Sequence, residues 1–222
     1  MSILRAQAIP LTPWPNGMGL TRQLLAYPDL EHPVCHVSLA EITADCAFSH
    51  FPGTDRISVP VSGDGFTLDV EGFGSLVADA THTALRYPGD RPTTCRLSGG
   101  PVRVLNVMIA RGMATAEQSL VPLTARLRLD PASGSLLAWC LDGLMTTGSG
   151  ETLTDDEGVY TDVPLVLQGK ATLVVVRNEH DRRRRLGIVV RAQATRAPRS
   201  GSWPSVRHRT KTACAVPRSS GR

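Results

Sequence analysis

Four side chains on two apolar stretches could hold a small molecule. Residues 35–42 alternate so that a strand would place His36 and Ser38 on one face. Within residues 102–111, Asn106 and Met108 share a face in the same way. A buried amide or hydroxyl needs a hydrogen-bonding partner, which is either a ligand or another core residue. These side chains suit a small anionic or amide-bearing ligand, and a core network without a ligand also accounts for them.

Two turn-rich segments carry further polar groups. Asp55 and Arg56 follow Phe-Pro-Gly at the entrance to a strand. They could neutralise each other as a structural anchor, or Arg56 could present its guanidinium to a ligand carboxylate. The side chain of Asn16, which precedes Gly17, could close an Asx-type turn or donate to a ligand carbonyl. Both segments leave a structural and a ligand-binding interpretation open.

The sequence lacks the patterns of common catalytic and metal sites. It has no Gly-x-Ser-x-Gly motif, no His-x-His pair and no glycine-rich phosphate loop before a helix. The histidines are His32, His36, His50, His82, His180 and His208. Ser38 and Ser49 each lie close to a histidine, so acid–base chemistry by His36 or His50 is the enzymatic alternative. We expect no catalytic residue, no metal and no cofactor.

The charges are divided unevenly along the chain. Residues 1–181 hold 12 Lys and Arg against 20 Asp and Glu, a net charge of −8, whereas residues 182–222 hold 12 basic residues and no acidic one. An acidic body is not expected to bind nucleic acid. Residues 182–222 are expected to be a mostly disordered tail, and only this tail could contact RNA, DNA or an acidic protein. The alternatives are a solvated tail and a C-terminus altered by a frameshift.

Cysteine usage and hydropathy indicate a cytoplasmic protein. The five cysteines lie at positions 35, 46, 95, 140 and 214 without a Cys-x-x-Cys pair, which is typical of reduced thiols, and the first four are expected to be small buried residues. No apolar run approaches the roughly 18 residues that a membrane span needs, and the N-terminal segment does not resemble a secretory signal.

Short strands joined by turns are the predicted elements. The chain contains 20 Gly and 16 Pro, and no stretch before the tail sustains a helical period. The predicted strands cover residues 21–27, 35–42, 56–60, 65–70, 83–86, 93–97, 102–111, 124–129, 135–141, 158–161, 163–167 and 171–177. They fall into two sets, over residues 14–111 and 120–177, which suggests two small antiparallel barrels.

Five ordered segments resemble the HutD/Ves family of small bacterial proteins. They are Pro-Trp-Pro-Asn-Gly-Met-Gly-Leu-Thr-Arg at 13–22, the strand at 35–42, Phe-Ser-His-Phe-Pro-Gly-Thr-Asp-Arg at 48–56, Tyr-Pro-Gly-Asp at 87–90, and residues 99–108. The resemblance implies an all-β double cupin of RmlC-like jelly-roll barrels, with a first barrel at residues 1–118, a second at 119–181 and the basic tail at 182–222. The second half resembles the family only loosely.

The same resemblance implies a non-catalytic role linked to histidine utilisation. The expected ligand is a small polar or anionic metabolite, such as urocanate or a formyl- or formimino-glutamate-like intermediate, bound by a protein that modulates the pathway. The expected ligand-binding residues are Asn16, Thr21, His36, Ser38, Ser49, Arg56, Asn106 and Met108. The alternatives are a cupin enzyme acting on a small polar metabolite and a stress-response protein with a vestigial pocket. The chain could also form a homodimer.

Overall fold

The computed structural model describes residues 1–14, 16–29, 31, 33–79, 83–131 and 134–180. These residues all belong to the first of two compact units, Met1–Val190. Within them there are antiparallel strands, a single 3-10 turn η1 (Ala6–Ala8) and no α-helix, so the all-β prediction is confirmed. No helix in this described part is long and apolar enough to cross a membrane. The predicted tail at 182–222 lies outside the described residues, as do positions 32, 82 and 208.

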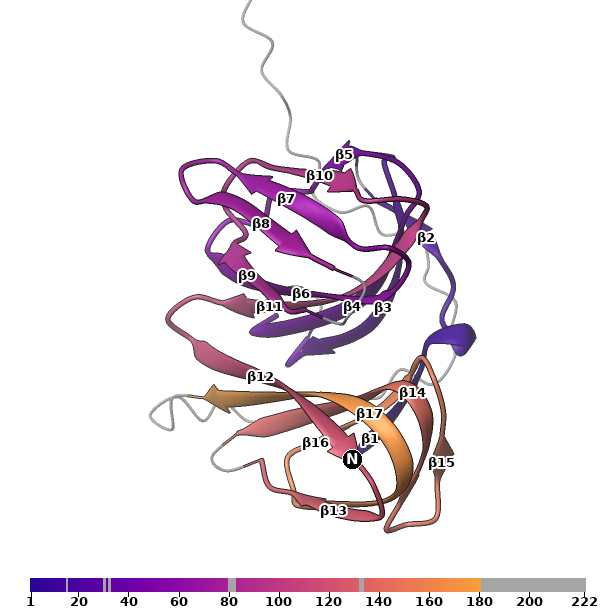
Figure 1. Cartoon of the computed structure of the whole chain (residues 1–222). Helices are drawn as coiled ribbons and strands as arrows, with labels where there is room; N and C mark the ends of the chain where they lie inside the picture. The colour runs from indigo at the N-terminus through magenta and orange to yellow at the C-terminus, as the bar shows by residue number, and fades with distance from the viewer. Residues whose placement is uncertain (15, 30, 32, 80–82, 132–133, 181–222) are drawn as a thin grey trace, which may run out of the picture. The chain divides into compact units, whose positions relative to one another are not determined.

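The strands form three antiparallel sheets (Figure 1). The six-stranded sheet has the order β2 (Thr12–Pro13), β3 (Leu20–Tyr27), β4 (Cys35–Ile42), β11 (Val102–Ala110), β6 (Thr54–Ser62), β9 (Leu85–Pro88). The four-stranded sheet has the order β5 (Cys46–Ala47), β10 (Thr93–Leu97), β7 (Phe66–Val70), β8 (Gly74–Ala78). The seven-stranded sheet has the order β1 (Ser2–Arg5), β16 (Glu157–Thr161), β14 (Ser135–Thr147), β17 (Leu165–His180), β12 (Ala114–Leu123), with β13 (Arg126–Leu129) on β17 and β15 (Thr152–Leu153) on β14.

The six-stranded sheet is buried on both faces. One face packs with the four-stranded sheet around a cluster that we call the outer core, which includes Phe48, Phe66, Tyr87 and Val104. The other face packs with the seven-stranded sheet around the central core, which includes Val37, Leu39, Leu105, Trp139 and Val174. Burial on both faces explains why β4 and β11 read as almost continuous apolar runs, with few polar residues among them. Each polar side chain on these strands therefore needs a specific explanation.

The seven-stranded sheet curls around an apolar cluster of its own, the distal core, which includes Leu136, Cys140, Leu165 and Leu173. Its long strands β14 and β17 bend where Gly143 and Gly169 take positive φ angles of 93° and 137°. A Cβ on Gly169 would lie 2.2 Å from the carbonyl oxygen of Leu144. Glycine is therefore required at this point of the β14–β17 pairing.

Several sheet positions differ from the sequence prediction. The strands predicted at 163–167 and 171–177 are parts of one strand, β17, which continues through Gly169. Strands β1, β8 and β12 were not predicted. In β8 and β12, Gly, Ser, Glu and Gln interrupt the apolar pattern, and β1 has only four residues. β1 pairs with β16. The boundary expected between residues 118 and 119 falls inside β12, which pairs with β17 from Ala114 to Leu123.

Candidate functional site

The predicted residues on β4, β11 and β6 lie side by side across the six-stranded sheet. Met108 is opposite both His36 and Arg56, and Asn106 is opposite both Ser38 and Ser58. Directly opposed residues of antiparallel strands point to the same face. The face is that of the outer core, because Val104 lies on it, two residues before Asn106. The sequence prediction that His36 and Ser38 share a face, and that Asn106 and Met108 share one, is therefore confirmed, and the four share one face.

Arg56 is the charged member of this group, and its side chain is almost completely buried, with 5% exposed. Its guanidinium carbon lies 5.0 Å, 5.4 Å and 5.3 Å from the ring centroids of Phe48, Phe51 and Tyr87. These distances are typical of cation–π contacts. The three rings surround the cation without neutralising it.

The polar contacts of Arg56 are few and long. Nη2 donates to Asn106 Oδ1 at 3.4 Å, and Nη1 donates to the carbonyl oxygen of Ser49 at 3.4 Å. Nε is buried and has no hydrogen-bond partner among the residues that the structure describes. No ion pair joins Arg56 to any Asp or Glu in the part of the chain that the structure describes. The guanidinium thus retains donor capacity inside the outer core.

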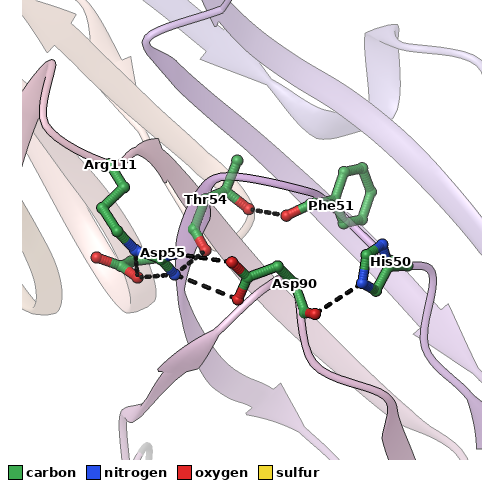
Figure 2. A network of polar contacts seen from close by, with 6 residues as sticks. All are labelled: His50, Phe51, Thr54, Asp55, Asp90 and Arg111. Carbon is green, nitrogen blue, oxygen red and sulfur yellow. Dashed lines mark hydrogen bonds and ion pairs between the residues drawn. The ribbon is translucent and has the colours of Figure 1, made fainter.

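The carboxylate of the neighbouring residue, Asp55, pairs with Arg111 and not with Arg56 (Figure 2). Its Oδ1 lies 2.7 Å from Nη2 of Arg111, whose Nη1 in turn lies 2.8 Å from Asp90 Oδ2. Nη2 of Arg111 also donates to the carbonyl oxygen of Thr54 at 3.1 Å. The interpretation of Asp55 and Arg56 as a mutually neutralised pair is therefore wrong. Successive residues of a strand point to opposite faces, which separates the two charges.

The Arg111 network fixes the turn that precedes Arg56. Hydrogen bonding from Arg111 lowers the pKa of Asp90, and the two carboxylates raise the pKa of Arg111. His50 Nε2 lies 2.7 Å from the carbonyl oxygen of Asp90 (Figure 2). His50 is exposed at the end of this network, on the segment that leads into β6. It is therefore placed to hold a turn.

A hydrogen-bonded chain crosses the site beside Arg56. The Tyr87 hydroxyl and Ser58 Oγ are 2.9 Å apart, and Ser58 Oγ donates to Asn106 Oδ1 at 2.6 Å. Because Ser58 has one hydroxyl proton, Tyr87 is the donor to Ser58. Burial is the main cause of the raised pKa of Tyr87. Asn106 Oδ1 therefore accepts hydrogen bonds from both Ser58 and Arg56. Its oxygen has partners within the core, as the interpretation without a ligand requires, and these bonds orient its amide.

His36 carries the second unused polar group of the site. Its Nε2 is buried and has no hydrogen-bond partner among the described residues. Burial, and then the charge of Arg56, lowers the pKa of His36 to about 4. The ring is therefore neutral at pH 7, and Nε2 donates or accepts according to the tautomer. An uncharged imidazole and an uncompensated guanidinium face the same core.

The remaining predicted residues use their polar groups on the backbone. Asn16 Nδ2 donates to the carbonyl oxygen of Ala47 at 2.9 Å, and its Oδ1 accepts from the Met18 N–H at 3.1 Å, which closes an Asx-type turn. Thr21 Oγ1 donates to the carbonyl oxygen of Leu39 at 3.3 Å. Ser49 contributes its main-chain oxygen to Arg56. These three residues shape the surroundings of the site.

Sequence reasoning missed Ser58, Tyr87 and Phe48. A signal for Ser58 was present, because it lies two residues after Arg56 on the same strand and so shares its face. Tyr87 comes to the site through the pairing of β9 with β6, where it is opposite Arg56. In the described ranges there is no group of three or more His, Cys, Asp and Glu side chains that could hold a metal ion.

A comparison with protein-family models matches residues 6–182 to the HutD model. The chain belongs to the HutD family. This assignment confirms the HutD/Ves resemblance of the five sequence segments.

Among curated HutD relatives, an uncharacterised 21.2 kDa protein from the hutC 3′ region of Pseudomonas putida is 33% identical over 50% of this chain and 58% of its own length. Protein Ves of Citrobacter koseri is 29% identical over 53% of this chain and 62% of its own length. The chain thus matches about three fifths of the length of these relatives.

Solved structures extend the HutD likeness over most of the described fold. HutD from Pseudomonas fluorescens has a TM-score of 0.70 and 22% identity, and covers 81% of this chain and 98% of its own. A cupin 2 conserved barrel domain protein from Leptotrichia buccalis has a TM-score of 0.53 and 10% identity, and covers 79% of this chain and 95% of its own. The HutD-family chain therefore has a cupin-like all-β fold.

Proposed function

We propose that this HutD-family protein is a non-catalytic binding protein for a small metabolite that carries a carboxylate. The buried guanidinium of Arg56, which has no ion pair with a described acidic residue, is the observation that carries this proposal. Burying an uncompensated cation costs several kcal/mol, and an anion on the guanidinium offsets this cost. A planar carboxylate matches the paired donors of an arginine.

The surrounding side chains suit the remainder of such a ligand. His36 is uncharged at pH 7 and its Nε2 has no partner in the described part of the chain, so it can bond to an amide, a formyl group or an imidazole. Ser38 and Met108 are buried on the same face, with 5% and 6% exposed, and supply a hydroxyl and an apolar surface. The ligand is therefore a small carboxylate with an uncharged polar group at its other end.

We further propose a double cupin in which only the first barrel binds a ligand. The first barrel comprises the six- and four-stranded sheets around the outer core, and the second comprises the seven-stranded sheet around the distal core. The distal core is an apolar cluster that includes Leu136, Met145 and Leu167. We assign a structural role to the second barrel, because Arg56 and His36, which carry the proposed recognition, both lie on the six-stranded sheet of the first.

The names of the relatives support a role in histidine utilisation. The P. putida relative is named for its position in the hutC 3′ region, and the P. fluorescens relative is named HutD. We propose urocanate or a formyl- or formimino-glutamate-like intermediate as the ligand, and modulation of the pathway as the result. About a dozen heavy atoms at roughly 0.5 kcal/mol each give a Kd of tens of micromolar, which suits a metabolite sensor.

Calorimetric titration with urocanate, N-formylglutamate and N-formiminoglutamate tests this function. We expect one of them to bind the wild-type chain and to bind Arg56→Gln at least about tenfold more weakly, because the charge-assisted pair is lost. Arg96→Gln is the matched control, since Arg96 is 58% exposed and pairs with Asp69 on the four-stranded sheet. Flat heats for all three compounds up to millimolar concentration would contradict the proposal.

A cupin enzyme is the second candidate, and the free Nε2 of His36 favours it. The neutral imidazole, whose Nε2 has no partner among the described residues, can accept a proton from a ligand bound beside Arg56, and its lowered pKa makes it a weak base. Incubating the bound compound with stoichiometric protein and following it by NMR separates the two functions. Conversion that His36→Gln abolishes would establish an enzyme, whereas an unchanged spectrum supports binding alone.

A further inference from the structure

Two thiols face each other in the outer core, outside the contacts used by the proposed ligand. Cys46 on β5 is directly opposite Cys95 on β10. Both are free cysteines, and they are 4% and 0% exposed. Both side chains contribute to the same core cluster. The sequence prediction that these cysteines are small buried residues is confirmed. Their positions on paired strands also place the two thiols where they could react with each other.

The backbone geometry is compatible with a bond between them. Opposed Cα atoms of antiparallel strands are about 4.5–5.5 Å apart, and a disulfide spans about 4.4–6.8 Å. Opposed Cβ atoms are also about 4.5–5.5 Å apart, whereas a disulfide brings them to about 3.8 Å. The strands must therefore close by roughly 1 Å. β5 is the element that can move, because it has two residues and lies at the edge of its sheet.

We propose that Cys46 and Cys95 form a disulfide on exposure to a peroxide and that this bond regulates the anion site at Arg56. The thiolate of Cys46 attacks a peroxide oxygen, the O–O bond breaks, and a sulfenic acid and hydroxide form. The thiolate of Cys95 then attacks that sulfur, which forms the S–S bond and releases a second hydroxide. The two thiol protons convert the hydroxides to water, so both sulfurs are oxidised and the peroxide is reduced.

Burial sets the rate of this reaction. It raises the pKa of Cys46, and it raises the pKa of Cys95 to about 12. Thiolates are scarce while the core is closed, so oxidation requires local opening of β5. The disulfide therefore forms slowly and only under sustained oxidation.

The segment that contains Cys46 also holds the aromatic partner of Arg56. Phe48 follows Cys46 by two residues, and its ring lies 5.0 Å from the Arg56 guanidinium carbon. The N–H of Phe48 donates to the carbonyl oxygen of Thr93 at 2.9 Å, at the start of β10. Closing β5 on β10 by about 1 Å therefore shifts Phe48 against Arg56. This regulatory half rests on the proposed function, whereas formation of the bond does not.

Disulfide mapping tests the bond. The reduced full chain is incubated with hydrogen peroxide, its remaining thiols are alkylated in denaturant, and the digest is analysed by mass spectrometry. We expect a linked pair of peptides containing Cys46 and Cys95, with loss of two hydrogen atoms. The pair should persist in Cys140→Ala, a control cysteine buried in the distal core, and be absent from Cys46→Ala and Cys95→Ala. No linkage in the wild-type chain, or linkage of other cysteines, would overturn the proposal.

Titration of the oxidised and reduced chains with urocanate and N-formylglutamate tests the regulation. We expect the oxidised chain to bind roughly fivefold more weakly, the scale of one cation–π contact. Equal affinities overturn the regulatory half and leave the proposed function intact. Absence of binding in both states refutes the proposed function together with its regulation, while the mapped disulfide is decided separately.

Discussion

The carboxylate of Asp55 and the guanidinium of Arg56 are adjacent in the chain but serve different parts of the molecule. Asp55 pairs with Arg111 at 2.7 Å on the exposed side, and Arg56 points into the outer core. Because the two side chains point to opposite faces of β6, Asp55 pairs with Arg111 and Arg56 has no ion pair among the described residues. The separation of these two charges creates the candidate anion site.

Arg111→Gln should lower the melting temperature at pH 7, because Asp55 and Asp90 both lose the guanidinium with which they pair. Arg111 lowers the pKa of Asp90 in the folded state, so this contribution is complete above the ordinary carboxyl pKa and is lost as the pH falls through the lower folded value. Thermal melts should show a difference at pH 7 that disappears near pH 2. Arg128→Gln, on an exposed position of β13, should melt like the wild type at both pH values.

His36 should make the stability of the protein depend on pH between the ordinary histidine value and about 4. Its folded-state pKa of about 4 is below the unfolded value, so the unfolded chain binds the additional proton in this range. The free energy of unfolding should therefore decrease from pH 6.5 to pH 4, by on the order of 2–3 kcal/mol.

Urea unfolding of wild type and His36→Gln at several pH values measures this dependence. The variant should show a flatter profile. His50→Gln is the matched control, because it makes the same substitution at an exposed histidine. A wild-type profile that is flat between pH 6.5 and pH 4 would contradict the burial of a neutral His36.

The sequence predicted which residues share a face of the sheet, but it did not predict which residues contact Arg56. Alternation along β4 and β11 placed His36, Ser38, Asn106 and Met108 correctly, because both strands are regular at these residues. The partners of Arg56 could not be predicted in this way, since they depend on pairing between strands that are distant in sequence. Tyr87 reaches Arg56 through the pairing of β6 with β9.

The strands that are buried on both faces were predicted, as were β7 and β10, whose buried and more exposed residues alternate, whereas β12 was missed. The bounds of β4 were predicted correctly, and β11 was one residue shorter than predicted. β12 was missed because Glu117, Gln118 and Ser119 interrupt its apolar residues. β12 is held in the sheet by its long pairing with β17. This pairing is a tertiary contact, which the alternation of residues within β12 does not predict.

Asn106→Ala should destabilise the protein by about 2–3 kcal/mol, because Ser58 and Arg56 both lose their acceptor in a buried environment. Asn16→Ala removes two hydrogen bonds at an exposed turn and should cost about 1 kcal/mol or less. Chemical unfolding of the two variants compares these costs. Similar losses in the two variants would show that the buried chain from Tyr87 to Asn106 contributes no more than a surface turn.

Gly169→Ala should be the most damaging small substitution in the seven-stranded sheet. The φ angle at Gly169 is 137°, and its new Cβ would lie 2.2 Å from the Leu144 carbonyl oxygen, so the paired strands β14 and β17 would have to separate there. A loss of at least about 3 kcal/mol is expected from backbone strain and displaced strands. Gly148→Ala is the matched control, because its Cβ would approach Val166 no closer than 3.7 Å and Gly148 has no positive φ. Equal unfolding free energies for the two variants would show that the bend of β17 does not depend on glycine, and the curl that encloses the distal core would then require another cause.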